Sequence, residues 1–343
     1  MFDLRGLCEA PSQPSTFKLQ TLKRCAIAAV NSRVVVVGSS NMDLVVRSPR
    51  IPVPGETILG GDFLMVPGGK GANQAVAIAK LGVHSIFVAR LGDDVFGRKS
   101  LENFQKENVD TRYVTLTPEA PSGVALITVD EAGNNAIVVA PGANARLSPD
   151  DVRRAQGEIR SAGAVVTQLE IPLATVECVA ELAHDARVPF ILNPAPAQTL
   201  PPALLARVTV LTPNETEAQI LTGVAVVDPE SASAAADRLL EAGVKSVIVT
   251  MGAKGSLLAE GNVREHIAAE RVKAVDTTAA GDAFTGALAV GVGRGQSLRD
   301  SALFANQAAA LCVTKMGAQP SMPTTEEVGA FVPAPREDSR RRK

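Results

Sequence analysis

Short apolar runs alternate with helix-like stretches along most of the chain. Residues 33–38 read RVVVVG and residues 85–92 read SIFVARLG, and each run ends at a glycine. Continuous apolar runs of this kind are typical of strands that are buried on both faces of a parallel sheet. Between them, the segment 71–82 has the alanine and aliphatic spacing of a buried helix that ends at Gly82.

The same alternation continues through the rest of the sequence and predicts βαβ units with a mainly parallel sheet. Further strands are expected at 164–170, 188–193, 208–214 and 246–252. Helices are expected at 94–109, 173–187, 215–222, 230–242 and 279–293. The pattern therefore predicts an α/β protein.

Two segments interrupt this rhythm. Residues 56–69 and 123–142 look like hairpins without an adjacent helix, and the second turns through 131–134. We expect them to form a small antiparallel sheet that acts as a lid over the active site. An edge extension of the main sheet would fit the same pattern.

The composition narrows the range of partners. Hydrophobic residues make up 46% of the chain and charged residues 20%, which provides ample material for a core. Aromatic residues are scarce at 3% and the net charge is −2, so neither a stacking platform for single-stranded nucleic acid nor a general polyanion binder is indicated. No apolar run approaches the ~18 residues of a membrane span. We expect no nucleic-acid partner and no membrane partner.

The cysteines point to a reducing compartment. Cys8, Cys25, Cys178 and Cys312 show no CxxC spacing, so neither a zinc site nor a disulfide framework is predicted. Reduced cysteines are the rule in the cytosol, and a cytoplasmic location is the simplest expectation.

The two ends differ from the middle of the chain. Residues 1–32 show no clean periodicity, and a disordered extension is favoured over a targeting peptide there. The tail 333–343 has the pattern of a solvated charge run. Residues 33–332 are the expected catalytic domain, with lid segments at about 44–67 and 121–141.

The glycine-rich stretch PGGKGANQ at 67–74 follows an expected strand and opens an expected helix. It is not a Walker A loop, because Lys70 is followed by Gly71 rather than by Ser or Thr. The first strand, which ends GSSNMD, lacks the dinucleotide fingerprint. Glycine-rich turns before a helix expose backbone N–H groups that suit oxygen-rich ligands. A tight structural turn would give the same pattern.

Polar residues follow several of the expected strands. Asn41 and Asp43 lie just past the first strand, and Glu170, Asn193 and Asn214 close others. Ligands of doubly wound sheets bind at this edge. Carboxylates accept hydrogen bonds while amides and lysine donate them, which suits vicinal hydroxyls. Each residue alone could cap its own loop, but the set indicates one shared crevice.

The stretch TMGAKG at 250–255 follows another expected strand. Its glycines could form an ordinary β-turn, or they could let a nucleotide approach the backbone closely. The pattern alone leaves both interpretations open.

The most informative stretch is DTTAAGDAFTGA at 276–287, where Ala279, Ala280 and Gly281 lead into a helix with Asp282 at its start. Free N–H groups in a first helical turn attract negative charge. Phosphoryl transfer needs such a site and a base near the attacking hydroxyl, and Asp282 is placed to be that base. Spacing alone favours a plain N-cap aspartate.

Residues 67–82 and 276–287 together resemble the two signatures of the PfkB-type carbohydrate kinases. Further matches run from about residue 33 to 323: GSSNMDLVV, PGETILGG, NNAIVVAPGAN, QLEIP, NPAPA, TPNETEAQILTG, TMGAKG and KMGAQPSMP. The resemblance implies a three-layer α/β/α sandwich with a β lid and ATP-dependent phosphorylation of a sugar hydroxyl. The segment 38–73 and the NPAPA and GAQPS stretches are most similar to those of members that phosphorylate the 5-hydroxyl of D-ribose.

The resemblance also implies a role for each matching residue. Asp282 would be the general base, and Ala279, Ala280 and Gly281 would supply the anion hole. The sugar would be held by Asn41, Asp43, Gly69, Lys70, Gly71, Ala72, Asn73, Glu170 and Asp282. The nucleotide site would be lined by Asn214, Glu217, Thr250, Met251, Gly252, Ala253, Lys254, Gly255, Gly281 and Asn306.

The resemblance also implies that two ions and a partner chain bind to this protein. Asn214 and Glu217 match an N-x-x-E motif that organises Mg²⁺ and phosphate, largely through water. An activating K⁺ would lie near the anion hole, held mostly by backbone carbonyls at Asp276, Thr278, Cys312, Lys315, Gly317 and Ser321. A homodimer is expected in which the lids of two chains clasp each other.

One departure from the family pattern falls in the anion hole. Many members have Gly-Ala-Gly-Asp where this chain has Ala279-Ala280-Gly281-Asp282. The extra methyl group at 279 is tolerable if the backbone φ angle there is negative, and no loss of activity is inferred.

Two rival functions remain at this point. A family member that phosphorylates deoxyribose, fructose or adenosine would share 250–287 and differ in 38–73. A catalytically silent sugar-binding protein on the same fold is the other rival, and the intact Asp282, Asn214 and Glu217 argue against it.

Overall fold

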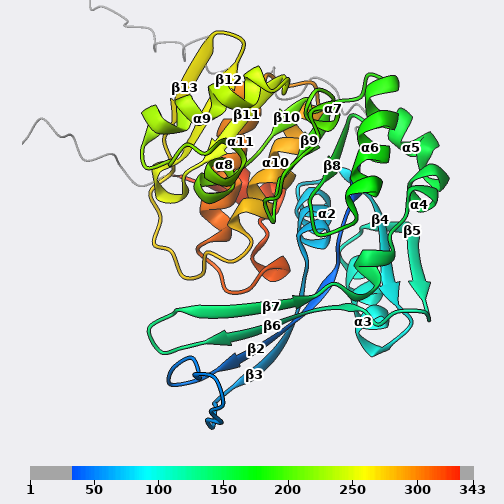
Figure 1. The fold of residues 1–343 in the computed structure, drawn as a ribbon, viewed down its shortest axis with the longest axis vertical. Coiled ribbons are helices and arrows are strands. Elements are labelled where there is room, and N and C mark those ends of the chain that lie inside the picture. The colour runs from blue at the N-terminus through cyan, green and yellow to red at the C-terminus, as the bar shows by residue number, and fades with distance from the viewer. Residues whose placement is uncertain (1–32, 333–343) are drawn as a thin grey trace, which may run out of the picture. The chain divides into compact units, whose positions relative to one another are not determined.

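The computed structural model describes residues 33–332. The expected extension 1–32 and the charged tail 333–343 lie outside the described residues. Within the described range, a large sheet is covered by helices on both faces, and a smaller sheet lies at the bottom of the view in Figure 1.

The large sheet carries the predicted parallel strands. Its members are β1 (Arg33–Val37), β4 (His84–Gly92), β5 (Asp110–Thr117), β8 (Ala164–Thr167), β9 (Phe190–Leu192), β10 (Val210–Leu211), β11 (Ser246–Thr250), β12 (Ser256–Glu260) and β13 (Val263–Ile267). Across the sheet the order is β13-β12-β11-β10-β9-β8-β1-β4-β5. Neighbours from β11 to β5 pair parallel, whereas β12 and β13 extend one edge antiparallel.

Successive side chains of β1 point to opposite faces of the sheet and enter two separate cores. Val35 and Val37 belong to one core, and Val34 and Val36 belong to the other. The first core is covered by α4 (Pro149–Arg154), α5 (Gln156–Arg160), α6 (Leu173–Asp185), α7 (Pro202–Leu205), α8 (Glu215–Thr222) and α9 (Pro229–Glu241). The second is covered by α2 (Lys70–Lys80), α3 (Val95–Lys106), α10 (Ala280–Gly293), α11 (Leu298–Cys312) and α12 (Thr325–Ala330). The expected three-layer α/β/α fold is thereby confirmed.

Three short 3₁₀ helices complete the described elements of the chain. They are η1 (Gly142–Arg146), η2 (Gly252–Lys254) and η3 (Gln319–Ser321). Within the described range, the helices are all too short or too polar to cross a membrane.

The smaller sheet contains the segments that were expected to form the lid, and these strands are called the lid below. It consists of β2 (Asn41–Arg47), β3 (Phe63–Gly68), β6 (Gly123–Val129) and β7 (Asn135–Ala140), in the order β3-β2-β6-β7. Both outer pairs are antiparallel, and the central β2–β6 pair is parallel. It forms a separate sheet, not an edge extension of the large one.

One of the two expected hairpins is wrong. The second hairpin occurs as β6 and β7, but residues 56–69 do not pair with themselves. Strand β3 pairs instead with β2, in a register that places Asn41 opposite Gly68. Asn41 and Asp43 therefore begin a lid strand and do not lie in a loop after β1.

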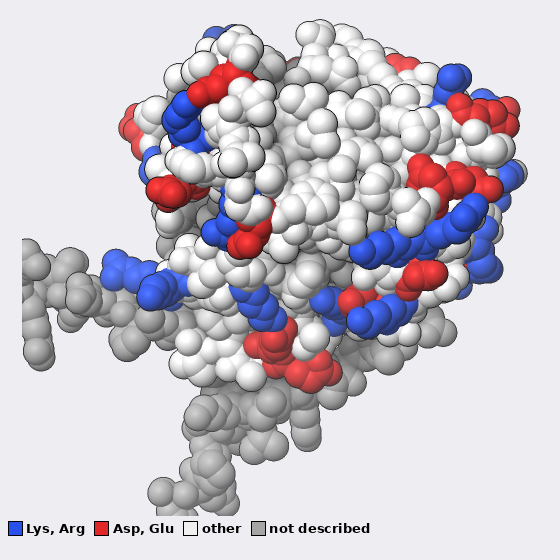
Figure 2. Space-filling model, turned by 90° about the horizontal axis from the view of Figure 1, so that it is seen from below, with Lys and Arg blue, Asp and Glu red and all other residues white. Residues whose placement is uncertain are grey.

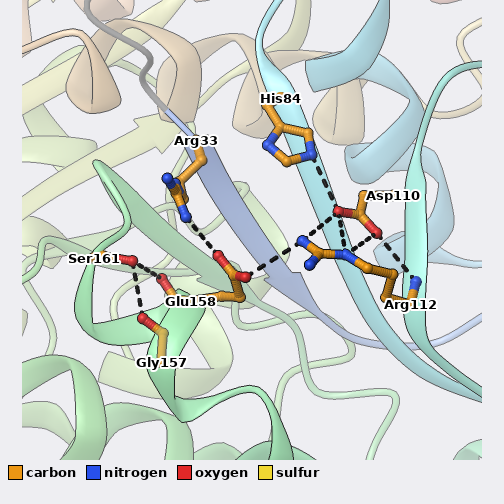
Figure 3. Close-up of polar contacts among 7 residues, drawn as sticks. All are labelled: Arg33, His84, Asp110, Arg112, Gly157, Glu158 and Ser161. Atoms are coloured by element: carbon orange, nitrogen blue, oxygen red, sulfur yellow. Dashed lines mark hydrogen bonds and ion pairs between the residues drawn. The ribbon is translucent and has the colours of Figure 1, made fainter.

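An ion-pair cluster fastens the amino ends of three neighbouring strands of the large sheet (Figure 3). Glu158 of α5 accepts from Arg33 at 2.6 Å and from Arg112 at 3.3 Å. Asp110 accepts from Arg112 at 2.7 Å and lies 3.1 Å from the His84 ring. Arg33, His84 and Asp110 are the first residues of β1, β4 and β5, so the cluster lies at the sheet edge opposite the carboxyl ends of the strands.

Candidate active site

A polar cavity of about 180 Å³ opens at the carboxyl ends of the parallel strands. Many of the residues that the sequence places in the sugar, nucleotide and anion sites meet here. These are Lys70, Asn214, Glu217, Thr250, Ala279, Ala280, Gly281 and Asp282. Asn193 also lines the cavity, as expected of a residue in the shared crevice. The other lining residues were not predicted as site residues, and they are Ala195, Thr212, Thr277 and Thr285.

Asp282 lies inside the first turn of α10 and is not its N-cap. Ala279 occupies the N-cap position and the helix begins at Ala280, which makes Asp282 the third helical residue. The plain N-cap interpretation is therefore wrong. The first turn of a helix leaves N–H groups without an intrahelical acceptor, and this turn borders the cavity together with the Asp282 carboxylate.

Two amide side chains hold the carboxylate of Asp282, a residue that is 6% exposed. Asn73 Nδ2 donates to Oδ2 at 2.8 Å, and Gln74 Nε2 donates to Oδ1 at 3.0 Å. Burial raises the pKa of Asp282 above its ordinary value, while the charge of Lys70 and the two amide donors oppose that rise. A carboxylate with a raised pKa is a stronger proton acceptor than an exposed one.

Lys70 supplies the positive charge of the cavity. Burial disfavours its ammonium group, but the carboxylates of Asp282, Glu170 and Glu217 outweigh burial and hold the pKa of Lys70 above its usual value. The lysine is therefore a charged group that faces three acids at the junction of the expected sugar and nucleotide sites.

The expected sugar contacts form a second group of acids beside Asp282. Glu170 Oε2 accepts from Ser39 Oγ at 2.5 Å and from the backbone N–H of Lys70 at 3.1 Å. Asp43 is raised to a pKa of about 7 by burial and then by the charges of Glu170 and Asp282. The charges of Asp43 and Glu170 therefore act on one another and on Asp282. Of the expected sugar contacts, only Lys70 and Asp282 line the cavity itself, and Asn41, Asp43, Gly69, Gly71, Ala72, Asn73 and Glu170 do not.

Two glycines allow α2 to approach β1 and β2. Gly69 has φ 89°, and a Cβ atom there would lie 2.6 Å from the backbone nitrogen of Asn41. A Cβ atom on Gly71 would lie 2.6 Å from the backbone nitrogen of Ser39. The glycine-rich stretch is therefore required for the close backbone contact that positions Lys70.

On the nucleotide side, Asn214 and Glu217 form a capping box at the start of α8. Asn214 Oδ1 accepts from the Glu217 N–H at 2.8 Å, and both Glu217 oxygens accept from Asn214 at 2.9 Å. Burial raises the pKa of Glu217. A β-bridge between Asn214 and Thr250 aligns the ends of neighbouring strands beside the cavity.

The remaining expected nucleotide residues do not line this cavity. Met251, Gly252, Ala253, Lys254 and Gly255 follow β11 in the η2 turn, where Lys254 Nζ donates to the Val227 carbonyl at 2.6 Å. Asn306 lies in α11 and donates to the Ile267 carbonyl at 3.3 Å. The backbone turn at 250–255 joins β11 to the antiparallel β12, so the β-turn interpretation describes its geometry.

Most of the expected potassium positions come together in two adjoining loops. Asp276 accepts from the backbone N–H groups of Thr278 and Gly317, both at 2.9 Å. Cys312 Sγ lies 3.0 Å from Ser321 Oγ and 3.9 Å from the Thr278 carbonyl. The Lys315 ammonium pairs with Glu327 at 2.6 Å, which leaves its backbone carbonyl as the group that the potassium prediction concerns. Within residues 33–332 there is no cluster of three or more His, Cys, Asp or Glu side chains with metal-binding geometry.

The backbone at Ala279 does not have the negative φ angle under which its extra methyl group would be tolerated. Its φ angle is +59°, in the left-handed region, where an L-residue with a Cβ atom is disfavoured by about 1–2 kcal/mol. The chain turns sharply at this position to enter α10, so the condition of a negative φ is not met. Glycine at this position would carry no such strain.

We expect Ala279→Gly to raise the free energy of unfolding by about 1 kcal/mol, because it removes the left-handed alanine. Urea denaturation of the substrate-free protein measures this change. Ala280→Gly is the matched control: it lies one residue further on, inside the helix, and should instead destabilise by about 0.5–1 kcal/mol. Equal destabilisation by both changes would contradict the strain argument.

Comparison with known proteins gives a consistent family assignment. The model of the pfkB family carbohydrate kinases matches residues 31–325. A ribokinase of Bacillus subtilis is 42% identical over 295 residues, which cover 86% of this chain and 97% of the relative. A deoxyribokinase of Salmonella typhimurium is 37% identical over 300 residues, which cover 87% of this chain and 98% of the relative.

A solved structure extends the similarity to three dimensions. The structure of Arabidopsis thaliana ribokinase complexed with ribose and ATP superposes with a TM-score of 0.81 at 38% identity, over 88% of this chain and 99% of that chain. The fold is thus that of a carbohydrate kinase. The chain belongs to the pfkB family of carbohydrate kinases.

Proposed function

We propose that this protein transfers the γ-phosphoryl group of ATP to the 5-hydroxyl of D-ribose. The observation that carries the proposal is the position of Asp282, whose buried carboxylate and helix N-terminus line one cavity with Lys70. The ribokinase relatives and the Arabidopsis complex with ribose and ATP support this choice of substrates.

In the proposed mechanism, the lid strand and the start of α2 hold the sugar. The hydroxyl groups of the sugar form hydrogen bonds with Asp43, Asn41 and Glu170. Asp282 accepts the proton of the attacking 5-hydroxyl while the new O–P bond forms and the bond from the γ-phosphorus to the bridging oxygen breaks, which releases ADP. Lys70 and the first-turn amides of α10 stabilise the charge on the transferred group.

The nucleotide would bring a magnesium ion whose contacts with the protein run through water. Magnesium prefers partly hydrated coordination and is commonly bound through substrate phosphates with few protein ligands. Both Glu217 oxygens already accept from Asn214, yet each keeps lone pairs for ordered water. When bound, Mg²⁺ neutralises phosphate charge. Isothermal titration of ATP with and without Mg²⁺, in the parent and in Glu217→Gln, tests this role.

The loops at Asp276 and Gly317 would hold the activating potassium ion. Their support is the pair of Asp276 hydrogen bonds that join the two loops next to the anion hole. Activity in potassium buffer compared with sodium buffer tests this assignment, and equal rates would remove it.

The lid also supports the proposed homodimer. Exposed apolar side chains lie on its strands at Phe63, Leu64, Met65, Leu126, Ile137, Val138 and Val139. Seen from below, charged side chains lie on both sides of the face and at its lower centre, and uncharged areas lie between them (Figure 2). Exposed apolar patches of this kind mark association surfaces. Sedimentation of the full chain distinguishes a dimer from a monomer.

A cytoplasmic location remains the proposed setting. Its support is that Cys178 and Cys312 are buried free thiols, as expected in a reducing compartment. Localisation of a tagged full chain by microscopy tests it.

The function is tested by measuring ADP release with ribose, deoxyribose, fructose and adenosine. We expect ribose to give the highest kcat/KM. A preference for deoxyribose would identify the chain with its deoxyribokinase relative. Ribose binding without turnover would instead identify a silent sugar-binding protein.

The pH dependence of ribose binding should follow Asp43. Its pKa in the free protein is about 7, and sugar hydroxyls that donate to the carboxylate favour the ionised form. Ribose affinity is therefore expected to be highest above pH 7 and to fall by up to about tenfold per pH unit below it. Calorimetric titration between pH 8 and pH 6 measures the dependence. In Asp43→Asn this pH dependence should vanish, and its persistence would assign the titration to another group.

A further inference from the structure

A buried glutamine contacts the expected catalytic base without belonging to the predicted sugar or nucleotide contacts. Gln74 lies in α2 and has no exposed surface. Its Nε2 donates to Asp282 Oδ1 at 3.0 Å and to Asn193 Oδ1 at 3.3 Å. Its Oε1 accepts from Gln168 Nε2 at 2.5 Å. Both donor hydrogens and the carbonyl oxygen of this amide are therefore engaged.

The neighbours of Gln74 fix the orientation of its amide. Asn193 Nδ2 donates to the Thr212 carbonyl at 3.0 Å, which leaves Asn193 Oδ1 to face Gln74. A flipped Gln74 amide would turn its oxygen toward two acceptors, Asn193 Oδ1 and the Asp282 carboxylate, and its nitrogen toward the Gln168 donor. An ionised carboxylate can only accept, so Gln74 must present its N–H to Asp282, and in this arrangement Gln168 Oε1 is left without a hydrogen-bond partner.

Two glycines make room for this chain of amides. A Cβ atom on Gly38, at the end of β1, would lie 2.1 Å from Gln168 Oε1. A Cβ atom on Gly286, in α10, would lie 2.8 Å from Ala77 Cβ and 3.2 Å from the Gln74 carbonyl oxygen. The sheet therefore accommodates Gln168, and the helices that carry Gln74 and Asp282 pack at very short range.

We propose that Gln74 is a positioning residue for Asp282, and that Gln168 acts on Asp282 through Gln74. This inference rests on the proposed function, in which Asp282 accepts the proton of the sugar hydroxyl. With Asn73 on the other oxygen, Gln74 fixes the plane of the carboxylate, and hence the direction of its lone pairs toward the cavity. An N–H donor also favours the ionised, proton-accepting form of a buried carboxylate.

The first test replaces Gln74 by Met, which has a similar shape and no amide. Supporting groups of this kind contribute about 10–100-fold to activity, so kcat with ribose and ATP should fall by about that factor. The KM for ribose should stay within about threefold, because the loss falls on the chemical step. Thr175→Val is the matched control. Thr175 lies in α6, outside the cavity, and the change removes its buried hydrogen bond to the Leu147 carbonyl. It should leave kcat unchanged.

The second test uses Gln168→Met, which leaves Gln74 and its contact with Asp282 in place. We expect a smaller loss of kcat than in Gln74→Met. If Gln168 acts through Gln74, the double variant should be no slower than Gln74→Met alone. Losses that multiply in the double variant would overturn the relay, and Gln168→Met keeps the test available if Gln74→Met folds poorly.

A third measurement does not depend on the substrate. The pKa of Asp282 can be followed in the full chain by ¹³C NMR of labelled aspartate carboxyls, with Asp282→Asn identifying the signal. Loss of the Gln74 donor should raise that pKa, and the acid limb of the kcat–pH profile should move to higher pH with it. An unchanged Asp282 pKa together with an unchanged kcat overturns the proposal. Failure of the parent protein to phosphorylate ribose would refute the proposed function alone, since the carboxyl titration still decides the role of Gln74.

Discussion

Asp282→Asn is expected to lower kcat by about 10³-fold while the fold and ribose binding persist. The amide has nearly the same size as the carboxylate but cannot accept the hydroxyl proton. The residue is 6% exposed and its side chain is fixed by two amide donors, so water cannot easily replace it as the base. Lys70 and the first turn of α10 remain, and they account for the residual activity. Steady-state rates measure the loss of kcat, and calorimetry measures whether ribose binding persists.

Asp228→Asn is a matched control for that change. Asp228 caps the start of α9 through a 2.8 Å hydrogen bond from the Ser231 N–H and lies outside the cavity. The control should lower stability slightly and leave kcat unchanged. A kcat of Asp282→Asn within about tenfold of the parent would show that another group takes the proton.

Lys70→Met is expected to reduce kcat/KM by about 10²–10³-fold. The change removes the positive charge that faces Asp282, Glu170 and Glu217. Three acids would then share the pocket without that cation, and the Asp282 pKa should rise, because Lys70 is the largest influence that holds it down. The acid limb of the pH–rate profile should therefore move to higher pH. Rates measured across pH 5–9 give both quantities.

Lys80→Met provides the comparison on the same helix. Lys80 lies at the other end of α2, where it is 3.6 Å from Glu107 and donates to the Gln319 carbonyl at 3.1 Å. Its loss should affect stability rather than kcat/KM. An acid limb that stays in place in Lys70→Met would mean that this lysine does not set the protonation of Asp282.

The large sheet could be predicted from the sequence because its central strands are buried on both faces. Runs such as Val34–Val37 are then continuously apolar, and no polar face obscures them. Helices such as α2 and α10 are alanine-rich and fully packed, which gives a similarly plain pattern.

The lid and the edges of the fold were harder to predict because their patterns are mixed. Strand β2 begins with the polar residues Asn41 and Asp43, and its partner β3 lies beyond a long loop, so local alternation could not identify the pair. Strand β5 is mostly half-buried at the sheet edge and was not predicted. Helix α11 was also missed, although Ser297 at its start accepts from the Asp300 N–H as a readable capping signal.

The candidate site divides in the same way. Asp282, Lys70 and Glu217 stand in sequence stretches whose pattern and family resemblance single them out, and they line the cavity. Thr212 and Thr285 carry no such signal, because a buried threonine beside a strand or inside a helix looks like ordinary core. The left-handed Ala279 was also beyond reach, since backbone conformation there depends on how the loop joins α10 to the rest of the fold.

The ion-pair cluster around Glu158 and Asp110 has a practical consequence for protein engineering. It joins the starts of β1, β4 and β5, whereas the residues that line the cavity lie near the opposite ends of strands or on helices that face them. We therefore expect that charges at the amino ends of β1, β4 and β5 can be redesigned to change heat tolerance without a change in turnover. We expect heat tolerance and turnover to be adjustable separately, so the amino ends of β1, β4 and β5 are a suitable place to attach linkers, surfaces or fusion partners.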